Sequence, residues 1–311
     1  MRRLILTVIT ATFVLLGASA HNPKAWRKLK SDVNVFVMSD SGREGCYDQQ
    51  LIANLMGEMA AKIKPKCVLA TGDIHHGNGV KSVKDNDWAQ NFADVYTHPK
   101  LKMEWHSALG NHEYRGNTQA VFDYSKVSPI WNTPDRYYTK VIKAKGTSVR
   151  LVIIDTTPLI EKYRSGNRYP DCVSQDKDEQ LKWLKKVLSE AQEDWVIVAG
   201  HHPIHADTKK NKIERTDMRN SVDKVLRKHK NVAMYICGHI HNFQHLRDKK
   251  SHIDYIVNSS GSYSRSVRMT KRTIYCSGEP GFSVISANEK ELRLHMIDKN
   301  GNVLHTVQRN K

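Results

Sequence analysis

The chain has 311 residues, enough for one large domain with a sizeable buried core. Its formal net charge of +17 favours anionic partners such as phosphate esters, nucleic acid or acidic lipid headgroups. The lysines and arginines are spread along the whole sequence, and no basic stripe is interleaved with aromatic residues. We therefore expect no specific nucleic-acid interface and interpret the charge as weak steering.

The first twenty residues have the pattern of a cleavable signal peptide. Arg2 and Arg3 precede an apolar stretch that ends in Ala18-Ser19-Ala20, the small-x-small motif of a signal peptidase site. A membrane anchor is the alternative, but the apolar stretch is short for a span and no stop-transfer charges follow it. We expect residues 1–20 to be removed, residues 21–311 to form one domain of charge +15, and the product to be secreted or periplasmic. No later segment is apolar enough to cross a bilayer, so we expect no stable membrane insertion.

The cysteines are odd in number and form no C-x-x-C pair. Cys67 and Cys237 lie in apolar runs typical of buried residues, whereas Cys46, Cys172 and Cys276 lie in polar stretches. The latter three could supply one disulfide in an oxidising compartment, and the sequence does not indicate which pair.

Short apolar runs and two helical patterns alternate along most of the chain. Buried strands are predicted at 33–38, 67–71, 105–109, 150–155, 195–200 and 232–238. Amphipathic helices are predicted at 49–64, ending before Pro65, and at 178–192. The runs at 254–259, 282–287, 291–297 and 303–308 have no helix between them, so we expect an antiparallel β layer there. A layered α/β domain is the economical interpretation.

Oxygen and imidazole donors follow five of the predicted strands, each beside a glycine. They are Asp40, Asp73, Asn111 with His112, His201, and His239 with His241. Taken singly, each is explained as a turn cap or a structural histidine. Ligands of open α/β sheets bind beyond the carboxyl ends of strands, so these donors should converge on one site. Donors without thiolate suit zinc, manganese or iron, and a set this large suits two ions that share a carboxylate.

The ordered motifs Asp-x-Gly, Gly-Asp, Gly-Asn-His-Glu, Gly-His-His-Pro and Gly-His-x-His resemble those of the calcineurin-like metallophosphoesterases. They are most similar to the small purple acid phosphatases of the tartrate-resistant type. Residues 91–139, 180–203 and 237–246 also look like stretches of that subfamily, and the resemblance covers residues 32 to 300. It implies an α/β fold in which a layered β-sandwich of two mixed sheets is flanked by helices.

The resemblance also implies a role for each donor. Asp73 would bridge two metal ions, and Asp40 and His241 would hold the first together with the residue at 76. Asn111, His201 and His239 would hold the second. His112 would protonate the leaving alkoxide, and Glu113 would orient His112 or be a solvated loop acid. We expect His202 and His205 to line the substrate pocket or support the ligands, and Asp155 to stabilise a turn.

Position 76 departs from the family pattern. The purple phosphatases carry Gly-Asp-x-x-Tyr, whose tyrosinate binds ferric iron and gives the colour, but this chain reads Gly72-Asp73-Ile74-His75-His76. Other branches of the superfamily take a first-metal histidine from Asp-x-His, where this chain has Gly42. A neutral imidazole at 76 should favour divalent ions and remove the charge-transfer band, leaving iron with zinc, manganese or a second iron. The alternative is that His76 points away and the first metal site is weak or empty.

The expected function is hydrolysis of phosphate monoesters outside the cytoplasm by a metal-bound hydroxide, with His112 as general acid. Phosphodiesters or nucleotides are alternative substrates of the same site, and the charge leaves open a nucleic-acid enzyme. A non-catalytic polyanion-binding protein on a decayed phosphatase scaffold is a further alternative, against which the intact donor set argues. The expected partner is a small phosphorylated substrate, and we expect a monomer.

Overall fold

The computed structural model describes residues 23–210 and 212–311. The expected signal peptide, residues 1–20, lies outside this range. Within it, no helix combines the length and the apolar character that a membrane crossing requires.

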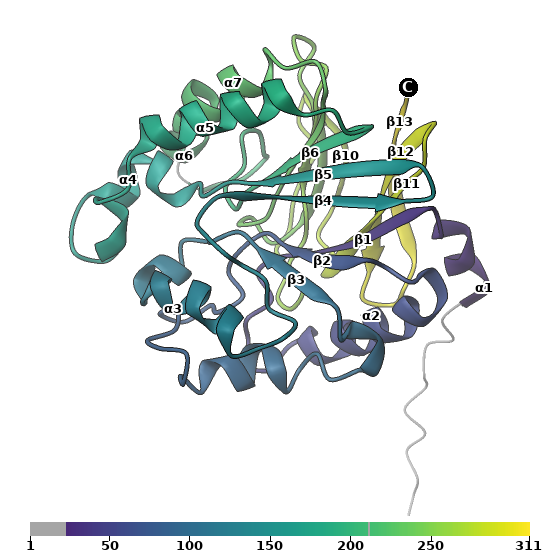
Figure 1. Ribbon diagram of the computed structural model, residues 1–311, viewed down its shortest axis with the longest axis horizontal. Coiled ribbons are helices and arrows are strands. Elements are labelled where there is room, and N and C mark those ends of the chain that lie inside the picture. Colours follow the sequence, from purple (N-terminus) through teal and green to yellow (C-terminus); the bar gives the residue numbers. More distant parts are fainter. Residues whose placement is uncertain (1–22, 211) are drawn as a thin grey trace, which may run out of the picture.

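Two mixed β-sheets form the centre of the molecule (Figure 1). The six-stranded sheet has the order β13 (Val303–Asn310), β12 (Glu291–Asp298), β11 (Gly281–Ala287), β1 (Val33–Met38), β2 (Cys67–Ala70) and β3 (Glu104–Ser107). The seven-stranded sheet has the order β10 (Thr273–Ser277), β8 (Phe243–Arg247), β9 (Asp254–Val257), β7 (Val232–Cys237), β6 (Trp195–Ala199), β5 (Thr147–Ile153) and β4 (Tyr138–Ala144). Strands β1, β2 and β3 are parallel, as are β5, β6, β7 and β9.

Strand β1 shows how the layers are held together. Successive side chains of a strand point to opposite faces, and every residue of β1 is buried. Val33, Val35 and Val37 join the apolar cluster that contains residues of both sheets. Phe36 and Met38 point the other way, into the cluster that includes the apolar face of the helix after β1. A strand buried on both faces reads as the continuous apolar run seen in the sequence.

Helices cover the outer faces of the sheets (Figure 1). Their bounds are α1 Pro23–Trp26, α2 Gln49–Ile63, α3 Thr118–Asp123, α4 Glu161–Arg164, α5 Lys177–Glu190, α6 Lys212–Met218 and α7 Lys224–Leu226. The connections include single 3-10 turns and two π-helical turns, at Ala89–Ala93 and Arg219–Asp223. Helix α2 ends before Pro65 as predicted, and the Asp176 carboxylate caps α5 by accepting from the amides of Asp178 and Glu179 at 2.8 and 3.0 Å.

The predicted fold class is confirmed, with one correction to the β layer at the C-terminal end. Strands β11, β12 and β13 are antiparallel, and β11 pairs with β1, so they complete the six-stranded sheet. The run predicted at 254–259 does not belong to that layer. It forms β9, which pairs in parallel with β7 in the other sheet and antiparallel with β8.

The expectation of a disulfide is wrong for this structure. All five cysteines lie among the described residues and all are free thiols. Cys172 is buried like Cys67 and Cys237, although its sequence surroundings are polar, because the 3-10 turn Pro170–Cys172 packs against the core.

Candidate metal centre

Parallel strands bring the predicted donors together from two sheets. Asp40, Asp73 and Asn111 follow the carboxyl ends of β1, β2 and β3. His201 follows β6, and His239 and His241 follow β7 in the other sheet. The carboxyl ends of parallel strands meet at one edge of a sheet, so each sheet delivers its donors to the same end of the sandwich.

Asp73 lies between the histidines of both sheets. Its Oδ2 is 3.2 Å from His201 Nε2 and 3.9 Å from the Nε2 atoms of His76 and His112. Metal-ligating atoms of Asp40, Asp73 and His201 lie within 4.8 Å of one another, and so do those of Asp73, His76 and His112. The carboxylate is thus placed to contribute to two neighbouring ion sites.

Asp40, which follows β1, and His241, which follows β7, face each other across the site. Their Oδ1 and Nε2 atoms are 3.2 Å apart, and the Nδ1–H of His241 donates to the Tyr263 carbonyl at 2.8 Å. That bond leaves the lone pair of the neutral ring on Nε2, the nitrogen that faces Asp40. Asp40 and His241 also form a metal-ligating group with His76.

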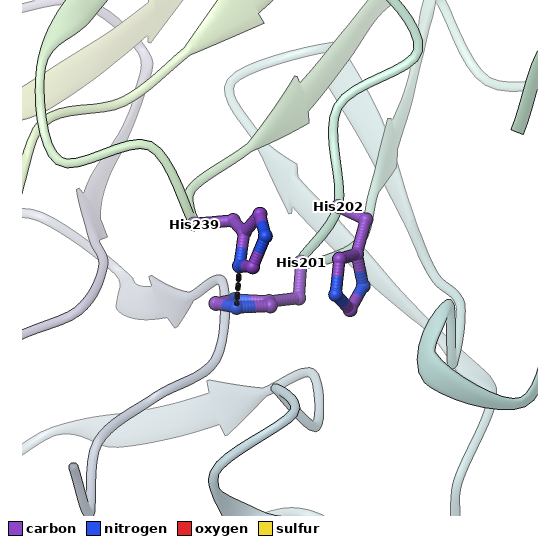
Figure 2. Close-up of side chains that lie close together, drawn as sticks. All are labelled: His201, His202 and His239. Carbon is purple, nitrogen blue, oxygen red and sulfur yellow. Dashed lines mark hydrogen bonds between the residues drawn. The ribbon is translucent and has the colours of Figure 1, made fainter. Parts of the chain in front are cut away.

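His201, His202 and His239 form a second cluster (Figure 2). His239 Nδ1 is 3.2 Å from His201 Nε2, and His201 Nδ1 donates to the Thr71 carbonyl at 2.8 Å. Burial opposes a charged His201 ring, but the Asp73 and Asp40 carboxylates outweigh it and raise the pKa of His201 to about 9. The negative charge that would attract a cation is therefore located on the Asp73 and Asp40 carboxylates.

The ring of His76 is turned into this assembly. It lies 4.4 Å from the His112 ring and 5.0 Å from the His241 ring, between centroids. Gly42 explains why the first motif supplies no histidine here, because a Cβ at 42 would lie 2.2 Å from the Ile74 carbonyl oxygen and 2.8 Å from the amide of His76. The loop that carries His76 occupies the space that a side chain at 42 would need.

Four donors sit in strained backbone. Asp40, Asp73, His239 and His241 have φ of 49°, 55°, 68° and 61°, in the left-handed region that non-glycine residues rarely adopt. Such strain persists where the surroundings over-determine it and clusters at ligand sites. The glycine before His239 belongs to the same packing, because a Cβ on Gly238 would lie 2.4 Å from Asp40 Oδ2.

His112 contacts Asp73 with its backbone and faces the cavity with its ring. Its amide donates to Asp73 Oδ1 at 3.0 Å. Nδ1 lies 2.9 Å from the Arg115 guanidinium and 3.0 Å from the Gly77 carbonyl oxygen, whereas Nε2 is the nitrogen nearer Asp73 Oδ2. Donation from Arg115 to Nδ1 puts the proton of the neutral ring on Nε2.

Glu113 is not a solvated loop acid, and no bond joins it to the His112 ring. It is buried, and its carboxylate accepts from the amides of Asp73, His75 and Gly110 at 2.9, 3.1 and 2.7 Å. Burial and the neighbouring Asp73 carboxylate raise the pKa of Glu113. Its contacts join the loop after β2 to the loop after β3.

The structure separates His202 from His205. His202 joins the histidine cluster, with Nδ1 2.9 Å from Thr156 Oγ1 and its ring 4.4 Å from that of His239. His205 lies elsewhere, against the Tyr255 ring and 3.9 Å from Asp248. Asp155 is also outside the cluster, where its carboxylate accepts from the Tyr114 hydroxyl.

The residues fit a dinuclear metal centre. Asn111 Oδ1 and Asp40 Oδ1 are buried without a hydrogen-bond partner, although buried polar atoms are nearly always bonded. Carboxylate, amide and imidazole donors are a set that zinc, manganese and iron accept. None of the candidate ligand groups among the described residues contains a thiol.

Basic side chains surround the cavity of about 420 Å³ at these donors. Its lining combines the donors with six cationic residues, namely Arg43, Arg115, Lys162, Arg168, Lys210 and Arg265. The only acids in the lining are Asp73 and Glu214. The fold therefore gathers at one site positive charge that is dispersed along the sequence.

Comparison with known proteins agrees with this geometry. Residues 33–243 match the calcineurin-like phosphoesterase family. Purple acid phosphatase 3 of Arabidopsis thaliana is 31% identical over 294 residues, which cover 89% of this chain and 78% of that protein. Tartrate-resistant acid phosphatase type 5 of Sus scrofa is 30% identical over 259 residues, covering 76% and 73%.

The chain belongs to the purple acid phosphatase family of calcineurin-like phosphoesterases. It is accordingly a metal-dependent phosphoric ester hydrolase, of a family that depends on a dinuclear metal centre. Two solved structures share its fold. GAP50, the anchor in the inner membrane complex of Plasmodium, has a TM-score of 0.77 at 21% identity, covering 90% of this chain and 89% of that one. Purple acid phosphatase PPD1 from yellow lupin has a TM-score of 0.66 at 15% identity, covering 90% and 54%.

Glu214 was not predicted from the sequence, although it contacts His239, one of the residues expected to bind a metal ion. Glu214 lies on α6, is buried, and its Oε2 is 3.1 Å from His239 Nε2. Its other oxygen accepts from Lys162 Nζ at 2.7 Å and from the Tyr163 hydroxyl at 2.8 Å. It stands in a highly polar stretch with no motif around it, so no sequence signal marks it.

Proposed function

We propose that this purple acid phosphatase homologue hydrolyses phosphate monoesters at a dinuclear centre bridged by Asp73. The observation that carries the proposal is the position of the Asp73 carboxylate between histidines of both sheets, 3.2 Å from His201 and 3.9 Å from His76 and His112. Asp40, His76 and His241 would hold one ion, and Asn111, His201 and His239 would hold the other.

Two bound cations would neutralise the charge of a phosphate ester and activate water as the nucleophile. The residues of the chain supply the remaining functions. Lys210 and Arg115 line the cavity and hold positive charge where phosphoryl oxygens would lie. Glu214 holds His239 through Nε2 and so leaves Nδ1 directed toward His201.

His112 is the general acid of the proposed reaction. An alkoxide is a poor leaving group, so its oxygen must be protonated as the P–O bond breaks. The Nε2–H of His112 faces the cavity beside Asp73, while the Arg115 guanidinium donates to Nδ1 and to the Gly77 carbonyl and so fixes the ring. The ring can then donate its proton without moving out of the site.

For the metals, we propose iron together with zinc, manganese or a second iron. His76 replaces a phenolate, and so removes a negative charge and a hard oxygen donor from the first ion. Its approach to Asp40 and His241 supports a place in that coordination sphere.

The test compares esters whose leaving groups differ in basicity, with the metal-loaded enzyme. We expect turnover of both p-nitrophenyl phosphate and an alkyl phosphate, and loss of both after chelation. His112→Ala should lower kcat for the alkyl ester by about 10²–10⁴-fold and for the aryl ester much less, because nitrophenolate leaves without a proton. An equal loss on both esters would remove the acid role, and faster turnover of bis-p-nitrophenyl phosphate than of the monoester would favour a phosphodiesterase.

A further inference from the structure

A second basic cavity, of about 350 Å³, shares no lining residue with the metal cavity. Its walls come from the loop after β6, from α6 with the π-helical turn that follows it, and from the segment before β10. His205, which the sequence suggested for the substrate pocket, is buried and lines this cavity instead. None of the described residues in the lining carries a carboxylate, and four are cationic, namely Lys212, Arg215, Arg219 and Arg272.

Helix α6 presents different residues to the two cavities. Lys212, Arg215 and Arg219 are spaced by three and four residues, the spacing that places side chains on one face of a helix. Glu214 lies on another face, where its carboxylate contacts His239 of the metal centre. The helix therefore directs a carboxylate to the metal centre and a row of cations to the second cavity.

Arg219 is held in place by neutral oxygens. Its guanidinium donates to the Ile204 carbonyl at 3.4 Å and to the Thr216 hydroxyl at 3.0 Å. In the part of the chain that the structure describes, no carboxylate oxygen lies within 4.0 Å of this guanidinium. These bonds fix the group beside the cavity without neutralising its charge.

The acids near the cavity are already engaged by another arginine. Arg227 donates to Asp223 at 2.7 Å and to Asp248 at 3.0 Å. The Arg272 Nε atom is 3.8 Å from the same Asp248 carboxylate, and its side chain is 57% exposed. Burial and the Arg272 charge lower the pKa of Arg219, although a guanidinium remains charged at neutral pH. An anion between the two arginines would relieve this repulsion.

We propose that this cavity is a second anion site, which binds a small tetrahedral oxyanion such as inorganic phosphate. Arg219 and Arg272 hold its oxygens, because planar guanidinium groups match the oxygens of phosphate in pairs. The cations converge on one cavity and do not follow an extended stripe, so the site suits a free ion better than a long polyanion. Binding here breaks no bond and does not depend on the proposed phosphatase function.

The test counts phosphate ions bound to the metal-loaded, full-length protein by equilibrium dialysis with labelled inorganic phosphate at constant ionic strength. We expect two ions per chain, one at the metal centre and one in the second cavity. Arg219→Gln/Arg272→Gln should bind one ion and hydrolyse p-nitrophenyl phosphate within about twofold of the wild type, because neither arginine lines the metal cavity.

A milder variant and a matched control accompany the double variant. Arg272→Gln alone changes a half-exposed side chain and should weaken the second site by about tenfold, the loss expected for one hydrogen bond to a charged group. Arg27→Gln/Lys28→Gln removes the same charge from exposed residues of the N-terminal 3-10 turn and should keep both ions.

Two results would overturn the anion site. One is a double variant that binds as many phosphate ions as the wild type with unchanged affinity. The other is a sulfated oligosaccharide that binds through Arg219 and Arg272 while inorganic phosphate does not, since the cavity would then serve a polyanion. A metal centre that binds no phosphate would leave one ion on the wild type and none on the double variant. That outcome supports the second site and counts against the proposed function.

Discussion

In the proposed centre, His76 replaces the phenolate ligand of the first ion by an imidazole. The purple phosphatases use a tyrosinate there, and its charge transfer to ferric iron gives the colour. In this chain the ligating atoms of His76, Asp40 and His241 lie within 4.8 Å of one another. An imidazole donor gives no such transition, so the ligand change is visible by spectroscopy.

The first prediction concerns this spectrum. We expect the iron-loaded wild type to lack the tyrosinate band and His76→Tyr to acquire it on ferric loading, as measured by visible absorption. His76→Phe is the matched control, since it places a ring of similar size without the hydroxyl. A strong visible band in the wild type, or its absence in the tyrosine variant at full iron occupancy, would contradict the role of residue 76.

In the proposed centre, a second residue, Glu214, acts through the ligand His239. Its Oε2 accepts a hydrogen bond from His239 Nε2 at 3.1 Å. This bond fixes the His239 ring and makes its Nδ1 a stronger donor to a metal ion. We expect Glu214→Gln to weaken retention of one ion by about 10–100-fold, measured by competition with a chelator. Glu161→Gln, an exposed acid paired with Lys177, is the control and should leave retention unchanged. Unchanged retention in Glu214→Gln would mean that Glu214 contributes only to packing.

At the scale of elements, Glu113 joins two of the site's loops. One buried carboxylate accepts three amides, from Asp73, His75 and Gly110. Removing the carboxylate leaves these buried amides without a hydrogen-bond acceptor, and each unpaired amide costs about 1–3 kcal/mol of folding free energy. The loops after β2 and β3 would then lose their relative position.

We therefore expect Glu113→Ala to lower the free energy of unfolding by about 3 kcal/mol, even in the metal-free protein, as measured by urea denaturation after chelation. Glu190→Ala, at the exposed end of α5, should change it by less than about 0.5 kcal/mol. If Glu113→Ala lost stability only in the metal-loaded form, Glu113 would act through the metal and not through the loops.

The central strands could be predicted from sequence, but several others could not. Strands β1, β2, β6 and β7 are buried on both faces, so each reads as a continuous apolar run. Strands β4 and β10 lie at sheet edges, and their half-exposed residues are mixed polar and apolar. Strand β8 was missed because its buried positions include Gln244 and His245.

Part of the site could also be predicted from the sequence. The motif residues follow strands whose ends must converge, so their meeting could be inferred. His205 follows the same strand as His201 but lies apart, against Tyr255, because the chain turns away after β6. The place of Glu214 depends on contacts between distant segments, which spacing along the chain does not encode.

Across the whole molecule, basic residues are dispersed along the sequence, and six of them line the cavity. We propose export directed by residues 1–20. Expression in a secreting host should yield a chain that begins at His21, measured by intact mass and N-terminal sequencing. Arg substitution of Ala18 and Ala20 should block that cleavage, since the site requires small residues. A secreted or cell-retained wild-type protein that still begins at Met1 would contradict the signal peptide.

The bridging role of Asp73 is the central claim, and metal stoichiometry tests it most directly. Elemental analysis of the purified protein after metal loading and removal of free metal should give two ions per chain for the wild type. Asp73→Asn should hold at most one and lose phosphomonoester turnover, because both ions share that carboxylate. A wild type that holds a single ion, or an Asp73→Asn variant that retains two ions and full turnover, would contradict the dinuclear centre described here.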